Sequence, residues 1–498
     1  CPVHLNAHGY VMAVKAGEWK RAQEIVRKER DFVFAATAAR ICTHPCEGEC
    51  KRSEVDSPVA IRTIKRFVTD WEFREYGGPE IDTEIKEERD KKVAIIGAGP
   101  AGLSCAFDLR KLGYKVTVFE RLPRGGGMLL TGIPPYRLPK DILEREVKVV
   151  EELVEVRYNT PVDRELFREI LNEYDAVFIA TGAHKSRGMG IPGEDLEGVY
   201  HAVSVLKKIN FGEPVDLGKR VMVVGGGNSA MDAARSALRL GCEVMVVYRR
   251  SRAEMPAIPE EVEAAMEEGI EFHFLRNPVE FVGRDGRLER VRLIKMELGE
   301  PDESGRRRPV PVPGSEYEVE VSSVLLAIGE RPDLSFVDGI ELTPWGTVKV
   351  DELTLQTSNP KVFAGGDCVT GPNTFIDAVA HGKRAAVSIH RFLEGKDLKE
   401  GREGELPWKS ELAGDKSLAY RKGRIVQPHL SVEERIKSFS EVELTPSEED
   451  IREEARRCIN CSVCSECGLC VLACEPEAIV HDMVDRIEEI EVGAIVVA

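Results

Sequence analysis

Nine of the thirteen cysteines lie in two groups whose spacing suits metal clusters. The groups are Cys42, Cys46 and Cys50, and Cys458, Cys461, Cys464, Cys467, Cys470 and Cys474. The last four have the C-x2-C-x2-C-x3-C spacing with which bacterial ferredoxins bind a 4Fe–4S cluster. Zinc is the alternative, although zinc ribbons normally use two well-separated pairs. The first residues show no secretory pattern, so we expect a reducing, cytoplasmic compartment in which clustered thiolates are metal ligands rather than disulfides.

The number of clusters stays open at both ends of the chain. One cubane needs four thiolates and two need eight, whereas the second group offers six, so a further ligand set can lie past residue 498. Cys1-Pro2 has the form of the last element of a ferredoxin run, and its partners are expected upstream. The chain starts without Met and stops in the strand-like run 492–498, so we expect that it is cut at both ends.

Two glycine-rich segments have the pattern of dinucleotide-binding turns, because each follows a short apolar run and opens a helical stretch. They contain Gly97, Gly99, Pro100, Ala101 and Gly102 in the first, and Gly225, Gly227, Asn228, Ser229 and Ala230 in the second. Such glycines let the backbone approach a pyrophosphate, and the helix N-terminus offers it N–H groups. Two fingerprints on one chain indicate two dinucleotides, and the usual pair is a flavin and a nicotinamide.

The first fingerprint is predicted to bind FAD. Glu120 ends the next strand about 20 residues after the glycines, where an acid accepts hydrogen bonds from a ribose. Gly127-Met128 follows as a flexible stretch that could lie along a ring system, and Gly366-Asp367 ends a later strand where the Asp could bind the polyol and phosphate region, although such a pair also suits a tight turn. The other candidate cofactor-binding residues are Arg137, Thr181 and Gly182. Hydride transfer needs no acid–base side chain, so no catalytic residue is named.

The second fingerprint is predicted to bind NADPH rather than NADH. Its second strand ends in Arg249 and Arg250 instead of an acid, and cations at this place suit a 2′-phosphate. A solvated basic loop is the alternative. No Cys-x-x-Cys lies between the two sites, and Cys105, Cys242 and Cys368 are isolated, which disfavours a dithiol reductase. The reduced flavin is therefore expected to pass its electrons elsewhere.

These sites require an α/β fold: two Rossmann-like domains, with the nicotinamide domain inserted in a split flavin domain. The expected domains are 1–85, a helical iron–sulfur domain that is N-terminally incomplete; 86–217 and 345–398, FAD-binding; 218–344, NADPH-binding; 399–455, a linker; 456–482, a ferredoxin-like 4Fe–4S segment; and 483–498, the start of a further domain. The length of 498 residues suits about three domains. The net charge of −17 argues against nucleic acid as a partner, and no apolar run reaches the length of a membrane span.

Three further motifs, taken with the fingerprints, carry a family resemblance. They are ICTHPCEGECKR at 41–52, GIPPYRLPK at 132–140 and YRRSRAEMP at 248–256. Residues 1–395 resemble the small (beta) subunit of NADPH-dependent glutamate synthase, the N-terminal half of dihydropyrimidine dehydrogenase and the large subunit of NADH-dependent ferredoxin:NADP oxidoreductase. The C-terminal cysteine run and the strand after it look like the start of a heterodisulfide-reductase A-like flavoprotein.

The resemblance implies two 4Fe–4S clusters in the N-terminal domain. Cys1, Cys42 and Cys46 would bind one, and Cys50 would join upstream cysteines on the other. The family often supplies a Gln or Glu as fourth ligand of the first cluster, and Lys65 stands at that position. An ammonium group cannot bind iron, so the sequence departs from the family pattern at this residue.

Together these features predict an NADPH-linked flavin and iron–sulfur oxidoreductase. Electrons would pass between NADP(H), FAD and 4Fe–4S clusters, and then to a partner subunit or a ferredoxin. The C-terminal cysteines favour the nicotinamide module of a heterodisulfide-reductase-like or electron-bifurcating complex. The electron-input subunit of glutamate synthase is the second hypothesis. The third hypothesis is a non-catalytic scaffold that only carries clusters. Such a scaffold would need neither Glu120 at the first fingerprint nor Arg249 and Arg250 at the second.

Overall fold

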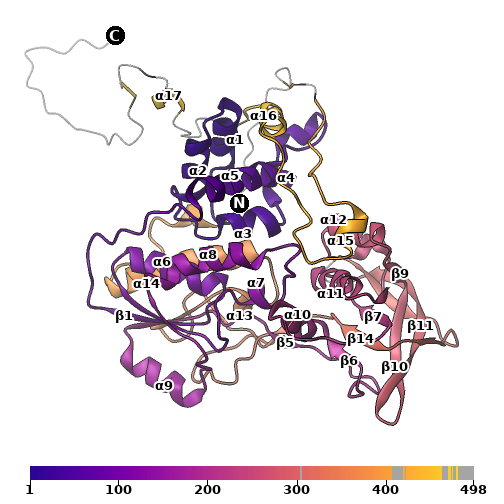
Figure 1. Ribbon diagram of the computed structural model, residues 1–498. Coiled ribbons are helices and arrows are strands. Elements are labelled where there is room, and N and C mark those ends of the chain that lie inside the picture. Colours follow the sequence, from indigo (N-terminus) through magenta and orange to yellow (C-terminus); the bar gives the residue numbers. More distant parts are fainter. Residues whose placement is uncertain are drawn as a thin grey trace, which may run out of the picture.

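The computed structural model describes residues 1–302, 305–406, 419–420, 422–461, 469–472, 474 and 478–479. Figure 1 shows a helical domain at the top of the molecule and two α/β domains side by side below it. Two expected cluster ligands, Cys464 and Cys467, lie outside the described residues, and so does the expected further domain at 483–498.

The N-terminal domain is a bundle of short helices. They are α1 (Ala7–Ala16), α2 (Trp19–Arg27), α3 (Ala35–Ile41), α4 (Pro45–Gly48), the 3-10 helix η1 (Lys51–Glu54) and α5 (Ile61–Tyr76). Helix α5 carries Ile61, Ile64 and Val68 at the spacing of one helical face, and all three are buried. This face packs α5 against α1, α2 and α3, so the first residues of the chain form the expected helical domain.

The first α/β domain is built on a five-stranded parallel sheet in the order β16-β4-β1-β2-β3. The strands are β1 (Lys92–Ile96), β2 (Lys115–Phe119), β3 (Glu155–Arg157), β4 (Ala176–Ile179) and β16 (Val362–Ala364). The helices are α6 (Pro100–Lys111), α7 (Met128–Thr131), α8 (Lys140–Glu151), α9 (Arg164–Glu173), α13 (Asp367–Thr370) and α14 (Phe375–Leu393). In β1, Val93 and Ile95 enter the core shared with α6, α8 and α14, whereas Ala94 and Ile96 enter the core on the α9 side. Both faces of the sheet are therefore covered.

The second α/β domain repeats this plan with the order β6-β14-β7-β8-β9. The strands are β6 (Val199–His201), β7 (Arg220–Val224), β8 (Glu243–Tyr248), β9 (Glu271–Phe274) and β14 (Ser323–Leu326), and the helices are α10 (Ala202–Asn210), α11 (Asn228–Arg239), η2 (Arg252–Glu254) and α12 (Pro259–Glu267). An antiparallel sheet covers the other face, formed by β10 (Arg276–Arg284), β11 (Arg287–Pro301), β12 (Arg307–Pro311) and β13 (Tyr317–Glu320). The expected insertion of one dinucleotide fold into another is confirmed.

The boundaries of the inserted domain differ from those expected at residues 218 and 344. Strand β6 pairs with β14 of the second sheet, so this domain begins before residue 218. At the other end, Phe336 packs in the core of the first sheet, so the domain ends before residue 344. Strands β5 (Lys185–Ser186) and β15 (Glu330–Arg331) pair where the chain crosses between the domains. A three-residue strand such as β6 is too short to show a periodic pattern in the sequence.

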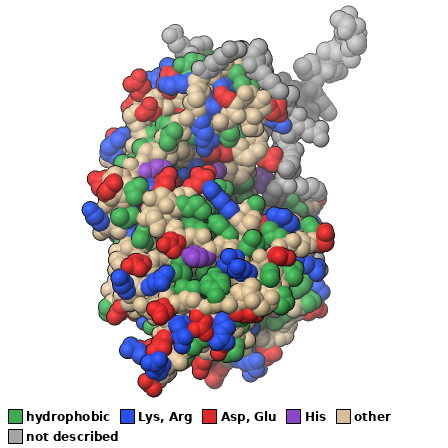
Figure 2. Space-filling view, turned by 90° about the vertical axis from the view of Figure 1, so that its right-hand side faces the viewer, with side chains coloured by type: hydrophobic (Ala, Val, Ile, Leu, Met, Phe, Trp, Pro, Cys, Tyr) green, Lys and Arg blue, Asp and Glu red, His purple; other side chains and the backbone are tan. Residues whose placement is uncertain are grey.

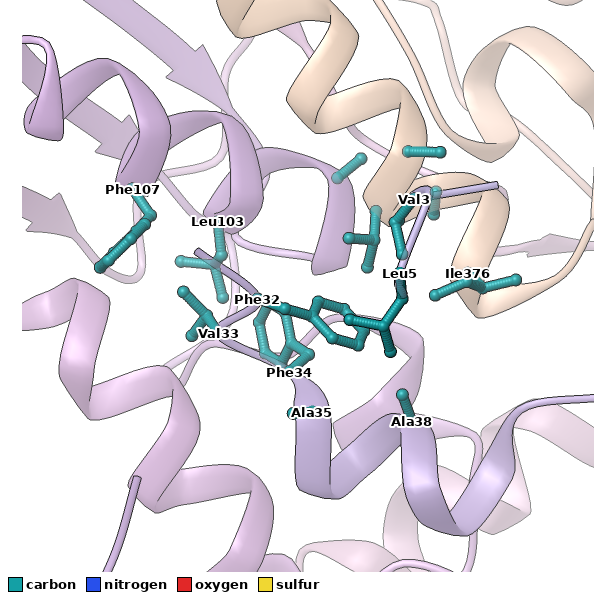
Figure 3. Close-up of a cluster of buried hydrophobic side chains, with 14 of the residues drawn as sticks. Val3, Leu5, Phe32, Val33, Phe34, Ala35, Ala38, Leu103, Phe107 and Ile376 are labelled. Carbon is teal, nitrogen blue, oxygen red and sulfur yellow. The ribbon is translucent and has the colours of Figure 1, made fainter. Parts of the chain in front are cut away.

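The helical domain and the flavin domain share one hydrophobic core. Figure 3 shows Phe32 and Phe34, which lie between α2 and α3, packed close to Leu103 of α6 and Ile376 of α14. Phe34 also meets the ring of Phe375 edge-on, with the ring centroids 6.1 Å apart. An interface that is continuous with both cores holds the two domains in one fixed orientation.

The segment expected to be a linker packs against two domains. We call residues 422–447 the strap; it contains α15 (Val432–Arg435) and is followed by α16 (Glu448–Arg456). Figure 1 shows the strap running from α15, beside α12, up to α16 on the helical domain. Arg435 pairs with Glu267 at 2.6 Å, and at the other end the Glu441 carboxylate accepts hydrogen bonds from Arg40 and Arg66. Residues 422–455 of the expected linker at 399–455 are therefore a structural element, and charged residues such as Arg424, Arg435 and Glu441 are ion-pair partners rather than part of a solvated coil.

The remaining short elements among the described residues are the 3-10 helix η3 (Glu403–Glu405) and α17 (Leu469–Leu472). None of the described helices is long and apolar enough to cross a bilayer. Figure 2 shows a face on which acidic and basic side chains are interspersed rather than gathered by sign.

Candidate functional site

The main candidate site is a cavity of about 340 Å³ at the carboxyl end of the first sheet. It is lined by the first glycine turn, by the ends of β2, β4 and β16, and by the start of α14. Gly97 has a φ of 110°, and a Cβ there would lie 2.5 Å from the Ala180 carbonyl oxygen, so only glycine fits. Pro100 occupies the first position of α6, which leaves the N–H groups of the following turn open to a phosphate.

Glu120 lies in this cavity with its carboxylate fixed by the backbone. Its Oε2 accepts a hydrogen bond from the Ala98 N–H at 2.7 Å, and its Oε1 accepts one from the Leu122 N–H at 2.8 Å. The side chain is 6% exposed, and each oxygen keeps a further lone pair. The carboxylate can therefore accept hydroxyl hydrogen bonds from a ribose without moving.

Several polar groups in the cavity fit a flavin nucleotide. The Thr181 hydroxyl is buried without a hydrogen-bond partner among the described residues, and Gly182 lies beside it. Burial raises the pKa of Asp367 to about 7, with Glu330 and Asp377 adding to the effect. Burial lowers the pKa of His184 to about 4, so this imidazole is neutral at pH 7. The other predicted residues that line the cavity are Gly99, Ala101, Gly127, Met128 and Gly366; Gly102 lies behind them in α6.

Arg137 does not line this cavity, although it was predicted to contact a cofactor. Its guanidinium pairs with Asp232 at 2.8 Å and with Glu261 at 3.0 Å, both on the nicotinamide domain. Arg235 and Arg239 stack on the ring of the preceding Tyr136, with centroid distances of 4.8 and 4.0 Å. The GIPPYRLPK motif is therefore a joint between the two dinucleotide domains.

The charges of this joint meet at Glu268, which directly follows α12. Its carboxylate accepts hydrogen bonds from Arg235 at 2.7 Å and from Arg239 at 2.9 Å, and Arg435 of the strap lies 3.3 Å away. Despite burial, these guanidinium groups lower the pKa of Glu268 to about 2. Sequence reasoning missed this group, because its members are scattered and no local pattern marks them.

The second glycine turn has the geometry of a dinucleotide site. Gly225 has a φ of 146°, Gly227 is the N-cap of α11, and Asn228, Ser229 and Ala230 form its first turn. A Cβ on Gly226 would lie 2.5 Å from the ring of Tyr248, so the turn packs directly on the end of β8. The Asn228 side chain accepts a hydrogen bond from the Ile258 N–H at 2.9 Å, which fixes the loop that faces the turn.

The two arginines after β8 have different environments. Arg250 is buried, pairs with Asp302 at 2.6 Å and donates to the Arg307 carbonyl at 2.7 Å. Arg249 is exposed, and its guanidinium makes no hydrogen bond or ion pair with the described residues. Partial burial and the neighbouring Arg250 and Arg306 lower the pKa of Arg249, although Asp302 acts in the opposite direction. Of the predicted pair, only Arg249 is placed to meet a phosphate.

Three predicted iron ligands meet in a small cavity of the helical domain. Cys1, Cys42 and Cys46 line it together with Lys65 of α5 and Ile376 of α14. The described residues contain no group of three Cys, His or acidic side chains that could hold a single metal ion. A cubane spreads its ligands over four irons, and three thiols around one cavity suit it better than a mononuclear ion.

Cys458 and Cys461, the first two C-terminal cysteines, lie beside Cys50 of the helical domain. Arg52 donates to the Arg457 carbonyl at 3.0 Å, which brings Cys458 next to the turn that carries Cys50. Burial raises the pKa of Cys458, and the neighbouring Cys461 and Cys50 add to the effect. Cys470 and Cys474, the other two described members of the ferredoxin pattern, are exposed and partly exposed, respectively. The start of the ferredoxin-like segment is therefore docked on the N-terminal domain rather than separate from it.

The fold and the sites define a class: a reductase with two dinucleotide folds and an N-terminal cysteine-rich helical domain. Residues 91–382 match the family described as pyridine nucleotide-disulphide oxidoreductase, and residues 1–76 match dihydropyrimidine dehydrogenase domain II, 4Fe-4S cluster. The chain belongs to the pyridine nucleotide-disulphide oxidoreductase family. It is an FAD-dependent NAD(P)H oxidoreductase with a 4Fe–4S domain at its N-terminal side.

Several proteins of known name are similar to this chain. The NADP(+)-dependent formate dehydrogenase subunit beta of Moorella thermoacetica is 45% identical over 96% of this chain and 71% of that protein. The NADPH-Fe(3+) oxidoreductase subunit beta of Geobacter sulfurreducens is 38% identical over 93% and 74%. The glutamate synthase [NADPH] small chain of Escherichia coli is 37% identical over 79% and 88%. In structure, Mycobacterium tuberculosis FprA in complex with NADPH matches with a TM-score of 0.52 and 23% identity over 64% of this chain and 87% of that one, which shows the shared fold.

Proposed function

We propose that this chain passes electrons between NADP(H) and a partner protein, through FAD in the large cavity and iron–sulfur clusters on the helical domain. When bound, FAD supplies the conversion between two-electron hydride chemistry and single electrons. Glu120 and the α6 N-terminus hold its ribose and phosphates, and Arg249 holds the 2′-phosphate of the nicotinamide. Cys1, Cys42 and Cys46 hold the cluster next to the flavin.

The main support for this proposal is a short helical turn that lines both cavities. Phe375 lines the large cavity, and Ile376, the next residue of α14, lines the small cavity with the three cysteines. The first turn of α14 therefore contributes to the walls of both the predicted flavin site and the predicted cluster site. Phe34 packs edge-on against Phe375, and Phe32 lines the small cavity; both rings are buried and lie near Ile376 (Figure 3). Such a wall suits electron transfer, because it keeps two redox groups close and apart from solvent.

The C-terminal cysteines extend the route toward the surface. Cys458 and Cys461 dock beside Cys50, so a cluster on the C-terminal segment would lie next to the clusters of the helical domain. The similarity to the formate dehydrogenase and NADPH-Fe(3+) oxidoreductase beta subunits spans 93–96% of the chain, whereas that to the glutamate synthase small chain spans 79%. We therefore propose that this chain is an electron-transfer subunit of a complex similar to those that contain the formate dehydrogenase and NADPH-Fe(3+) oxidoreductase beta subunits. A heterodisulfide-reductase-like or bifurcating complex stays a prediction.

The relay is tested with Cys46→Ser in the full chain, purified without oxygen. FAD content and NADPH oxidation by a dye that accepts from the flavin should stay unchanged. Electron transfer to a one-electron protein acceptor, and one 4Fe–4S EPR signal, should be lost. Cys242→Ser is the matched control, because its hydroxyl can keep the 3.3 Å hydrogen bond to the Gly218 carbonyl and it lies in the other domain. An unchanged EPR spectrum and unchanged protein reduction in Cys46→Ser would refute the relay.

A further inference from the structure

Lys65 is a buried cation for which the described residues offer no anionic partner. It is 6% exposed, it lies in the second turn of α5, and it lines the small cavity with Cys1, Cys42 and Cys46. Its ammonium makes no hydrogen bond or ion pair with any described residue. Lys140, which is also largely enclosed, instead donates to two backbone carbonyls. Most of the Lys65 side chain is enclosed and no described anion pairs with it, so an anionic group bound in this cavity would gain its charge as a partner.

The nearby carboxylate cannot be that anion, because other groups already use it. Glu47 accepts a hydrogen bond from the Arg62 N–H at 2.8 Å and pairs with Arg424 of the strap at 2.5 Å. The other acidic groups that line the cavity are the three thiols and the buried phenol of Tyr10, whose burial raises its pKa further. Lys65 lines the same small cavity as the Cys1, Cys42 and Cys46 thiols. The ammonium is therefore close enough to the thiols to act on their charge.

We propose that the 4Fe–4S cluster of this cavity has three protein thiolates, from Cys1, Cys42 and Cys46, with Lys65 at the fourth corner as a counter-charge rather than a ligand. The inference rests on the proposed function, which places a cluster in this cavity. Three thiolates and a cluster form an anion, and its negative charge grows on reduction. A buried cation stabilises the reduced form most, because Coulomb interactions are strong away from water.

Two properties of the cluster follow. Its reduction potential is higher than it would be without Lys65, since net charge is one of the factors that set cluster potentials. One of its irons also has no ligand from the described residues. That iron is the one a mild oxidant would release first, leaving a 3Fe–4S cluster.

The first test compares the midpoint potential of this cluster in the wild type and in Lys65→Met, measured by EPR-monitored redox titration of the full chain. Methionine keeps the length and apolar stem but removes the charge, so the potential should shift to a more negative value. Lys65→Arg keeps the charge and should stay near the wild type. Lys20→Met, which removes an exposed charge from α2 of the same domain, is the control. An identical potential in Lys65→Met and the wild type would overturn the proposal.

The second test counts ligands through iron loss. Ferricyanide treatment of the wild type should produce a 3Fe–4S EPR signal. Lys65→Glu places a carboxylate where the fourth ligand would be, so it should slow this loss. Equal resistance of the wild type and Lys65→Glu would show that a fourth protein ligand already exists, and would refute the three-thiolate site.

Failure of this inference can be told from failure of the relay. If Cys46→Ser leaves every cluster signal intact, no cluster occupies the cavity and the proposed function fails. If Cys46→Ser removes a signal but Lys65→Met leaves its potential unchanged, only the role of Lys65 fails. FAD content and dye reduction by NADPH should be the same in all Lys65 variants, and this shows that each variant folds. If Lys65→Met loses the cluster altogether, the test rests on Lys65→Arg. This variant must then keep the cluster and its wild-type midpoint potential, and a changed potential would contradict the proposal.

Discussion

Replacement of Arg249 by alanine should remove the preference for NADPH, whereas replacement of Arg250 should not. Arg249 is an exposed cation after β8 that the described residues leave without a hydrogen bond or ion pair, and Arg250 and Arg306 lie near it. Arg250 is held by Asp302 at 2.6 Å and by a backbone carbonyl, so its charge is already compensated. Only one of these adjacent arginines is therefore available to a 2′-phosphate.

The size of the effect follows from the bonds that are lost. A charge-assisted hydrogen bond to a phosphate contributes about 1.5–3 kcal/mol. Loss of this contact in Arg249→Ala should reduce kcat/KM for NADPH by about 10- to 150-fold, since about 1.4 kcal/mol corresponds to a factor of ten. NADH lacks the phosphate, so its kcat/KM should change by less than about threefold, the range of an ordinary surface substitution.

The assay is steady-state oxidation of NADPH and NADH with a dye that accepts from the flavin, at moderate ionic strength. Arg252→Ala is the matched control, because this arginine is about half exposed and its ion pair is with Glu263 at 3.1 Å. Arg250→Ala should affect both cofactors alike and lower stability, since it leaves Asp302 without this partner. A specificity change in Arg250→Ala and none in Arg249→Ala would refute the assignment.

Three further predictions concern stability and cofactor retention. Glu268→Gln should lower unfolding stability by about 3–5 kcal/mol, because buried arginines lose their counter-charge; the pKa of Glu268 is lowered to about 2, so its contribution should be present above about pH 4.5 and disappear as the pH falls toward 2, as chemical denaturation at several pH values would show. Asp367→Asn should stabilise the FAD-free protein near pH 7 in thermal melts. The reason is that the pKa of Asp367 is raised to about 7 in the folded protein, so the wild-type protein loses folding stability as the pH rises from about 4 to 7 and this carboxyl becomes charged. The same variant should retain FAD less well on gel filtration. Glu441→Gln should raise proteolysis of the strap without changing NADPH oxidation, because Arg40 and Arg66 lose a shared partner; equal cleavage of both proteins would contradict this role.

The local parts of the fold could be predicted from the sequence, and the nonlocal parts could not. The turns at Gly97 and Gly225 carry their structure in adjacent residues, because the strand, the turn and the helix N-terminus are contiguous. Arg137 was assigned to a cofactor because its motif is distinctive, but its partner Asp232 lies 95 residues away. Charge runs such as the strap look solvated in sequence, since an ion-pair partner in another domain leaves no periodic signal.

The same limit explains the cysteines. Spacing placed Cys458 and Cys461 with the ferredoxin run, whereas the structure docks both beside Cys50 through Arg52 and Arg457. The position of Lys65 was recognised as a departure from the family, but its burial and its cavity became visible only in three dimensions. Cysteines at opposite ends of a chain have no spacing that could reveal that they meet.

The flavin domain has two interfaces of different chemistry, and the difference matches what each neighbour must do. Toward the helical domain the interface is a closely packed apolar core around Phe34 and Ile376, supplemented by the fully buried ion pair of Arg27 with Glu146 at 2.9 Å, and this packing fixes the distance between the two cavities. Toward the nicotinamide domain the interface is a joint of arginines and carboxylates around Glu268. The chain passes between the two domains at the short paired strands β5 and β15. Electron transfer between resident groups needs a constant separation, whereas a nicotinamide must enter and leave. The apolar interface suits the first requirement. The charged joint suits the second, because ion pairs can exchange partners and water on opening while a packed core cannot.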